Sequence, residues 1–348
     1  MPTSASTRGA LCGLTAAALF GLSAPLAKPL LGSTSPLTLA GLLYFGGGLA
    51  LTAASLVRKR TNEAPLLRED APLVGLLVLC GGIVGPVLML FALQRASASG
   101  VSLLLNLEGP FTLAIAALAF HEHVGWRGLA SLAAVVAGAL VLSLPSTPVR
   151  LPLLAALCVA GACLAWGLDN NLTRALSLRD PVALVRTKTL GAGLCSLSLS
   201  LLVLRQPLPG WRTTLLALAL GAASYGTSIL LDAYALRMLG AAREAAYFAT
   251  APFLGALGAV VLLQEKLSAS TLLAGGEMGV GVWLLLSERH GHTHSHEAVE
   301  HEHRHVHDVH HQHSHPAEVL EPHSHPHRHA PLTHDHPHVP DAHHHHRH

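Results

Sequence analysis

The sequence predicts an all-α membrane protein with ten transmembrane helices arranged as two inverted five-helix repeats, plus a disordered His-rich C-terminal tail. Three observations lead to this fold class. Apolar residues make up 51% of the 348 residues and charged residues only 12%, against roughly 25% charged residues in a soluble domain. The last part of the chain, residues 288–348, is almost entirely polar. In the apolar part, one long stretch of sequence occurs twice.

The duplicated stretch covers Leu93–Leu142 and returns as Leu236–Leu286. Each copy has an apolar run with a proline, a short break with a glutamate, and a second apolar run. Within this stretch, Pro110-Phe111 aligns with Pro252-Phe253, Glu122 with Glu265, and Gly138 with Gly281. The same pairing extends upstream of it, where Phe20-Gly21 aligns with Trp166-Gly167, Lys28 with Arg174, and Ser35-Pro36 with Asp180-Pro181. Such self-similarity indicates a repeat architecture. We divide the chain into a first repeat (1–146), a second repeat (147–287) and a tail (288–348).

A hydrocarbon core about 30 Å thick is crossed by ~20 apolar helical residues. Ten stretches have about this length: Gly9–Leu31, Pro36–Val57, Pro72–Gln94, Ala98–Phe120, Trp126–Leu144, Leu153–Ala175, Pro181–Leu204, Thr213–Met238, Gly240–Leu263 and Ser268–Ser287. The breaks between them are short, so neighbouring helices are expected to pack as antiparallel hairpins. We expect Pro25, Pro86, Pro110 and Pro252 to kink helices and not to end them, because neighbours can satisfy the freed carbonyl groups.

The distribution of Lys and Arg between the loops predicts the orientation, because these residues are enriched on the cytoplasmic side. With the N-terminus inside, the cytoplasmic ends hold Arg8, Arg58, Lys59, Arg60, Arg68, Arg127, Arg174, Arg179, Arg237, Arg243 and Arg289, and the opposite ends hold Lys28, Arg95, Arg150, Arg205, Arg212 and Lys266. Both termini are then cytoplasmic in a multi-pass protein of the plasma (inner) membrane. Five helices per repeat is an odd number, so the two repeats insert in opposite senses, as in many secondary transporters.

The chain resembles the EamA-type transporters of the drug/metabolite transporter superfamily. That family has ten helices in two halves, each ending in a proline-bearing helix, a short Glu-containing turn and a Gly-rich helix. The resemblance covers about residues 9–287 and implies secondary transport, often export, of small metabolites driven by an ion gradient. It leaves the substrate open, because the family spans amino acids, nucleobases, sugars and drugs. Two departures are the histidine-rich turn at Glu122 and the lack of an acidic counterpart for Glu108 in the second half, where Thr250 or Ala251 falls.

Ionisable residues at bilayer depth are the candidates for a transport path, since each costs ~2.5–3.5 kcal/mol on insertion scales and needs a partner or water. Glu108, with Asn106 close by, lies in the fourth predicted helix, and Glu277 lies midway along the tenth. Such carboxylates can bind substrate or pass a proton. The alternative for each is a buried carboxylate fixed by an Arg or a backbone amide.

Further candidates lie in the second repeat. Asp169 and Asp232 belong to the sixth and eighth predicted helices, and Trp166, Tyr44 and Tyr225 are candidate walls of the path. Arg186 and Lys188 lie about 8–11 Å inside the seventh helix at 1.5 Å per residue, from where a long cation can reach the surface. They either anchor or pair with an anion, or they contact a substrate, which would then be anionic or zwitterionic. Glu122 and Glu265 are expected to cap the following helix or to hold the turn.

The tail contains all but two of the 26 histidines. Imidazole nitrogens in H-x-H repeats can gather around Zn²⁺, Ni²⁺, Co²⁺ or Cu²⁺ without a preformed pocket. The candidate ligands are His292, His294, His296, His301, His303, His305, His307, His310, His311, His313 and His315. Low-complexity sequence with few apolar residues is expected to be disordered. An adventitious repeat or a pH-dependent charge remains the alternative to a metal-binding role.

Two functions follow from these features. The first is a proton-coupled carrier, an exporter by resemblance, for a small organic solute, which needs no cofactor. The second is a carrier for nickel, cobalt or zinc, with the tail collecting or sensing the ion; a metal-storage tail on a membrane anchor is a third reading. No nucleophile–base pair, H-E-x-x-H motif or phosphate loop is present, so no enzyme is expected. Nucleic acid is not an expected partner; the lipid bilayer, the small-molecule substrate and metal ions at the tail are, and a homodimer remains open.

Overall fold

The structure is a computed structural model. It describes residues 4–57, 64–120, 125–143, 152–176, 179–239 and 241–287, together with the tail segments 290–296, 300–305, 323–328 and 332–338. The expected turn at Glu122 therefore lies outside the described residues.

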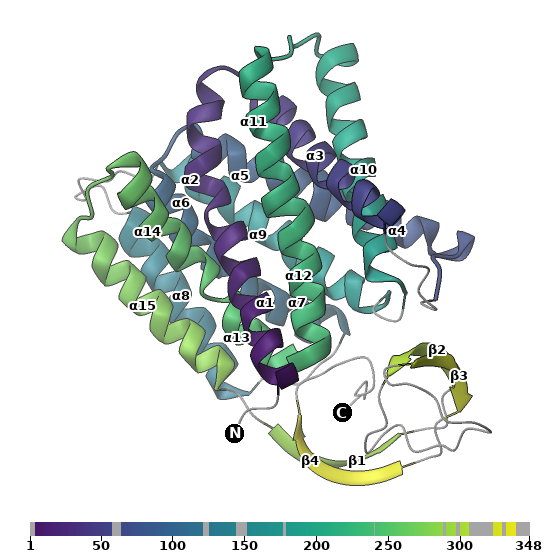
Figure 1. Ribbon diagram of the computed structural model, residues 1–348. Coiled ribbons are helices and arrows are strands. Elements are labelled where there is room, and N and C mark those ends of the chain that lie inside the picture. The colour runs from purple at the N-terminus through teal and green to yellow at the C-terminus, as the bar shows by residue number, and fades with distance from the viewer. Residues whose placement is uncertain are drawn as a thin grey trace.

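The membrane part is a bundle of long helices, several of them divided into consecutive segments (Figure 1). The first half contains α1 (Ser4–Gly21), α2 (Ser23–Ala27), η1 (Lys28–Gly32), α3 (Pro36–Val57), η2 (Arg68–Asp70), α4 (Ala71–Leu77), η3 (Val78–Val84), α5 (Gly85–Leu93), α6 (Ala98–Leu104), η4 (Leu105–Leu107), α7 (Glu108–Phe120) and α8 (Trp126–Ser143). The second half contains α9 (Leu153–Arg174), α10 (Pro181–Ser198), η5 (Leu199–Val203), α11 (Trp211–Gly221), η6 (Ala222–Thr227), α12 (Ser228–Leu239), α13 (Ala241–Phe248), α14 (Ala251–Leu263) and α15 (Ala269–Leu286).

Eight helices of the described part are long and apolar enough to cross a membrane. Eight of the ten predicted spans correspond to them. The fifth predicted span is represented by the shorter apolar helix Trp126–Leu142. The seventh is α10, whose Arg186 and Lys188 reduce its hydropathy. The structure thus supports a multi-pass integral membrane protein, and the total of ten spans stays a prediction.

The four prolines expected to kink helices each lie within the first three residues of a helical segment. Pro86 follows the π-helix η3, and Pro110 follows the 3-10 turn η4. Pro25 and Pro252 follow short turns after α1 and α13. Proline lacks a backbone N–H and crowds the preceding turn, so the helix continues only after an irregular turn.

The two halves are interleaved. The most extensive helix packings all join one half to the other, and the pairs are α1 with α12, α3 with α10, α5 with α9, α6 with α14, and α8 with α15. Glycines permit the closest of these approaches: a β-carbon at Gly221 would overlap the Leu43 carbonyl, and one at Gly193 would come within 2.7 Å of the Phe45 Cα. Small residues at such crossings are typical of membrane bundles.

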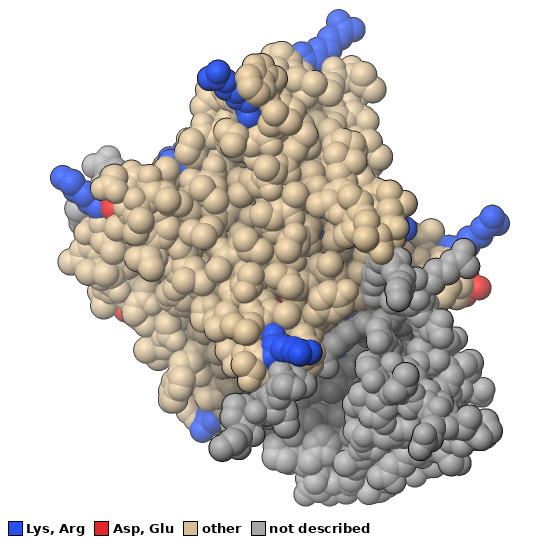
Figure 2. Space-filling model, in the orientation of Figure 1, with Lys and Arg blue, Asp and Glu red and all other residues tan. Residues whose placement is uncertain are grey.

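The outer surface of the bundle is apolar, as contact with lipid requires. Figure 2 shows Lys and Arg side chains near the ends of the bundle and almost none across its middle. Large apolar side chains point outward along the helices, with Leu118 80% and Leu202 76% exposed. Trp126 and Trp211 begin helices and Trp283 lies near the end of one, and all three are exposed. Tryptophan favours the membrane–water interface.

The described tail segments form two antiparallel strand pairs. Strand β1 (His290–His296) pairs with β4 (Leu332–His338), and β2 (Glu300–His305) pairs with β3 (His323–Arg328). Their sequences alternate histidine with polar residues and contain one large apolar residue, Leu332. They therefore supply no apolar core, and the disorder of the tail as a whole stays a prediction.

Candidate functional site

Three helices meet at the backbone carbonyl of Gly81 in the π-helix η3. The Tyr44 hydroxyl donates to this oxygen at 2.7 Å and the Trp166 Nε1 donates at 3.0 Å. A π-helix changes the regular hydrogen-bond pattern of an α-helix and is frequent at functional sites. A β-carbon at Gly81 would overlap the Asp169 carboxyl group. The glycine therefore lets Asp169 lie directly against η3.

Asp169 forms an ion pair with Lys188 of α10. The Asp169 residue is only 5% exposed, and its second oxygen, Oδ1, has no hydrogen-bond partner within the described part of the chain. Lys188 thus pairs with a carboxylate of the protein. This is the ion-pairing role expected as the alternative to substrate contact. Arg186 donates to the Ser55 Oγ at 3.0 Å.

Glu108 begins α7 and contacts α9. Its Oε1 accepts a hydrogen bond from the Asn170 Nδ2 at 2.9 Å. Since Asn170 follows Asp169 directly, one turn of α9 makes both the hydrogen bond to Glu108 and the ion pair with Lys188. Among the described residues, the charged groups that act on Glu108 are Asp169, Lys188 and Asp232.

Asp232 of α12 and Glu244 of α13 are hydrogen-bonded to each other through their carboxyl groups. Two carboxyl groups can share a hydrogen bond only when one of them carries a proton. The Asp232 Oδ1 is buried without a hydrogen-bond partner among the described residues. Glu108 also acts electrostatically on Glu244. Glu108, Asp169, Asp232 and Glu244 therefore form one set, called here the carboxylate group.

Five aromatic side chains, called here the aromatic group, pack beside it. Phe20 of α1 lies 6.2 Å from the Trp166 ring, 6.0 Å from the Tyr225 ring and 5.4 Å from the Phe248 ring, between centroids. The Tyr44 and Tyr225 rings are 5.0 Å apart. The three predicted wall residues, Trp166, Tyr44 and Tyr225, are thus brought together.

No hydrogen bond or ion pair among the described residues joins two predicted site residues, Asn106 and Glu277, to the carboxylate group. Asn106 is 5% exposed and its Nδ2 donates to the Leu103 carbonyl at 2.8 Å, so it holds its own helical turn. Glu277 lies on α15, which packs chiefly on α8, and it is not among the charged groups acting on Glu108 or Glu244. Its Oε2 is buried with no hydrogen-bond partner in the described chain.

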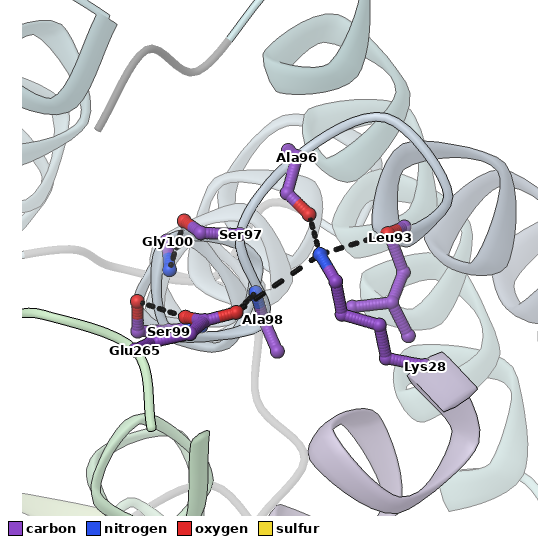
Figure 3. Close-up of polar contacts among 8 residues, drawn as sticks. All are labelled: Lys28, Leu93, Ala96, Ser97, Ala98, Ser99, Gly100 and Glu265. Atoms are coloured by element: carbon purple, nitrogen blue, oxygen red, sulfur yellow. Dashed lines mark hydrogen bonds and ion pairs between the residues drawn. The ribbon is translucent and has the colours of Figure 1, made fainter. Parts of the chain in front are cut away.

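A second polar cluster joins the two halves around Glu265 (Figure 3). Glu265, between α14 and α15, accepts from the Ala98 N at 2.7 Å and from the Ser99 N at 2.9 Å. The Lys28 Nζ lies 4.0 Å from the Glu265 Oε1 and donates to the Ala96 carbonyl. Of the two roles expected for Glu265, capping of the following helix is wrong: Glu265 caps α6 of the other half, and Ser268 caps α15 by accepting from the Thr271 N at 3.1 Å. The other expected role, holding the turn, stays a prediction.

Several site residues were missed by the sequence reasoning. Glu244 is an ionisable residue inside the ninth predicted span and meets the same criterion as Asp232. Phe20 aligns with Trp166 in the repeat and could have been selected on that ground. Gly81 and Phe248 carry no sequence signal, since their importance lies in contacts made across the bundle.

These features define a class: a polytopic membrane protein with two interleaved halves and a buried set of charged side chains at their interface, which is the arrangement of a membrane transporter. The family model described as EamA-like transporter family matches residues 7–144 and again residues 153–287. The chain therefore belongs to the EamA-like transporter family. This membership is consistent with the drug/metabolite transporter superfamily, and it implies a lipid bilayer and a small-molecule substrate.

Individual proteins are also similar to the chain. A protein of Methanothermobacter thermautotrophicus described as an uncharacterized transporter is 29% identical over 291 residues, which cover 78% of this chain and 84% of that protein. A solved crystal structure, described only as that of a protein, has 20% sequence identity and a TM-score of 0.60 over 79% of this chain and 94% of its own. The similarity to this solved structure shows a shared fold and nothing beyond it.

The contact between Gly81 and Asp169 gives a first prediction. Gly81→Ala should lower the free energy of unfolding by about 1–3 kcal/mol, the usual cost of overpacking, because the added methyl group overlaps a buried carboxyl group. Gly75→Ala is the matched control, since nothing lies within 4 Å of a β-carbon there. Thermal unfolding of both purified variants in detergent measures the difference. Equal stability of the two variants would show that η3 and α9 do not approach as described.

Proposed function

We propose that this protein is a secondary active transporter that exports a small metabolite in exchange for protons. Its two repeats insert in opposite senses in the plasma (inner) membrane, with both termini cytoplasmic, and alternate access to a site between them. One observation carries the proposal: the carboxylate group draws Glu108 from the first half and its other three members from the second half. A group shared in this way changes its surroundings whenever the halves move relative to each other.

Proton coupling is supported by the pairing of Asp232 with Glu244. Their hydrogen bond requires one proton between two carboxyl groups. Loss of that proton leaves two negative charges in contact at membrane depth, which is costly. Entry of a positive charge into the carboxylate group would then be linked to release of the proton that Asp232 and Glu244 share. Export as the direction rests on the resemblance of the two repeats to a family that often exports.

The cluster around Glu265 supports alternating access. It joins the α5–α6 connection of the first half to the α14–α15 connection of the second half through charge-assisted hydrogen bonds, which are stronger than neutral ones. In the conformation described here this end of the bundle is held together. An alternating carrier must break such contacts once in each cycle.

The role of Glu108 can be tested by export. Cells that produce the full chain should release at least one metabolite that control cells retain, as measured by mass spectrometry of the medium. Glu108→Gln should reduce that release at least about tenfold, the effect of losing a charged hydrogen-bonding partner, and a protonophore should reduce it in the wild type. Glu69→Gln, at an exposed position outside the site, is the control. Release at the wild-type rate by Glu108→Gln would contradict the proposal.

For the tail we propose binding of Zn²⁺, Ni²⁺, Co²⁺ or Cu²⁺, and the second candidate function is a carrier for such ions. The alternation of histidines favours it. Within the described residues no set of three or more His, Cys, Asp or Glu side chains is placed to hold a metal.

A version ending at Ser287, compared with the full chain, separates the two functions. If the protein carries metal, the full chain should change cellular nickel, cobalt or zinc content, and the shortened chain should do so less. Unchanged metal content with both versions, together with continued metabolite release, would exclude the metal carrier. Isothermal titration of Ni²⁺ into both purified proteins tests tail binding directly, and equal heats would contradict it.

A further inference from the structure

We infer that Glu265 and Lys28 are gating residues, which hold helices α6 and α14 together at their end of the bundle, and that helices α7 and α13 close the opposite end when this contact opens. The inference rests on the proposed function, since it assigns the alternation of access to named contacts. It is carried by the way in which both charges hold the α5–α6 connection, and by an asymmetry between the two repeats.

Lys28 holds the carbonyl end of the α5–α6 connection (Figure 3). The last carbonyl groups of an α-helix receive no hydrogen bond from within the helix. Where α5 ends, the Lys28 Nζ donates to the Leu93 carbonyl at 3.4 Å and to the Ala96 carbonyl. A cation suits this position, because carbonyl oxygens only accept hydrogen bonds, and an anion there would repel them.

Glu265 holds the amide end of the same connection. The first N–H groups of a helix likewise lack partners within it. Where α6 begins, Glu265 accepts from the backbone N–H groups of Ala98 and Ser99, and its Oε2 accepts from the Ser99 Oγ at 2.7 Å. The Glu265 side chain is 16% exposed, so these bonds replace most of its water. An anion suits this position, and an ammonium group, which only donates, would not.

Tight packing continues from these charges into the bundle. A β-carbon at Gly255 of α14 would lie 2.6 Å from the Gly21 carbonyl oxygen of α1 and 2.8 Å from the Ser102 Oγ of α6. One at Gly258 would lie 2.6 Å from the Leu22 side chain. The first span, α6 and α14 therefore meet without room for a further side chain. In the conformation described, this end of the bundle is closed.

The repeat symmetry gives this contact a counterpart at the opposite end. The alignment of Pro110 with Pro252 pairs α7 with α14, and it pairs α6, which precedes α7, with α13, which precedes α14. Exchange of the two repeats therefore turns packing of α6 on α14 into packing of α13 on α7. In the structure α6 packs extensively on α14, whereas α7 packs chiefly on α9, and α13 on α1 and α12. Inverted repeats alternate access around the site between them, so α7 and α13 are the pair that closes in the other state.

The break in the fourth span allows both changes in one movement. Its first segment, α6, is bound to α14, whereas its second segment, α7, is bound to α9. The Asn170 Nδ2 donates to the Glu108 Oε1, and the Asn171 Nδ2 donates to the Thr112 carbonyl at 3.0 Å. Between the segments lie the 3-10 turn η4 and Pro110. Helices bend at such irregular turns, so the angle between α6 and α7 can change while each segment stays helical.

The closed end is tested by the reactivity of a buried thiol in the purified full chain, in detergent. Ser102→Cys is placed in a chain whose five native cysteines are replaced by serine or alanine. Ser102 is 1% exposed, and its hydroxyl has no hydrogen-bond partner among the described residues. Glu265→Gln should raise the rate of maleimide labelling of this thiol at least about tenfold, the effect of losing charged hydrogen bonds. An unchanged rate would overturn the inference.

A second thiol separates opening of the gate from general loosening of the fold. Ser196→Cys on α10 is the matched reporter, since Ser196 is also 1% exposed and its hydroxyl also has no partner in the described chain. Helix α10 packs on α3 and not on α6 or α14. Glu265→Gln should leave labelling of Ser196→Cys unchanged, and Glu69→Gln should change neither reporter. Equal acceleration at both reporters would contradict a gate at α6 and α14.

Exchange of the two charges distinguishes a latch from a simple ion pair. The Lys28 Nζ and the Glu265 Oε1 are 4.0 Å apart, so a simple ion pair would re-form in the double variant Lys28→Glu, Glu265→Lys. Each charge here also matches one end of the α5–α6 connection, and the exchange reverses both matches. The double variant should therefore label Ser102→Cys at least as fast as Glu265→Gln does. Labelling at the slow rate of the unexchanged chain would overturn the assigned role.

Closure at the opposite end is tested on α13. Ala245 is exposed, and Tyr247, about 200° further around this helix, packs against Gly13 of α1. Ala245→Cys therefore lies on the face away from α1. Glu265→Gln should slow its labelling at least about threefold, because the population shifts toward the state in which α7 covers α13. Faster or unchanged labelling would contradict the coupling of the two ends.

The gate and the proposed function can fail separately, because labelling of the purified protein requires no transport. If labelling changes as expected but no metabolite depends on Glu108 for release, the gate holds and the proposed export falls. If Glu108-dependent export is found but Glu265→Gln leaves Ser102→Cys unreactive, export holds and the gating role of Glu265 falls.

Discussion

The structure depends on one constraint: charged side chains inside a lipid-facing bundle must find partners or water, because lipid offers none. The chain meets this constraint by collecting four of its intramembrane carboxyl groups at the interface of its two halves. Asp169 pairs with Lys188, Glu108 accepts from Asn170, and Asp232 and Glu244 share a hydrogen bond. The outer surface, by contrast, is covered by leucine, valine and tryptophan. The buried oxygens of Asp169 and Asp232 that have no hydrogen-bond partner among the described residues make this region a candidate site.

Irregular helix geometry makes this interface possible. The third helix of each half contains a π-helical turn, η3 and η6, and these turns carry Gly81 and Tyr225. The fourth and ninth predicted spans are interrupted before Pro110 and Pro252. Such turns free backbone groups for other partners, as the two hydrogen bonds to the Gly81 carbonyl illustrate. They also provide positions at which helices can bend during a transport cycle.

The sequence predicted the membrane class, the positions of most helices and the pairing of the repeats, because length, hydropathy and self-similarity are local properties. It also selected Glu108, Asp169 and Asp232, since an ionisable residue in an apolar run is conspicuous. The sequence could not show which of these residues contact one another in the folded chain. Glu277 meets the same sequence criterion as Glu108 but lies on α15, apart from the group. One of the two roles expected for Glu265, capping of the following helix, was wrong because its partners, Ala98 and Ser99, are far away in sequence. Contacts between halves depend on helix rotation and crossing, which hydropathy alone does not fix.

The central claim is that two copies of one five-helix unit insert in opposite senses, and labelling of corresponding loops tests it most directly. Pro65→Cys and Leu208→Cys, each in a chain with its five native cysteines replaced by serine or alanine, place one thiol in the loop between the second and third spans of each half. A membrane-impermeant maleimide should label Leu208→Cys in intact cells and Pro65→Cys only in inverted vesicles, while detergent should expose both. Labelling of both positions from the same side would contradict the inverted arrangement and the shared site that depends on it.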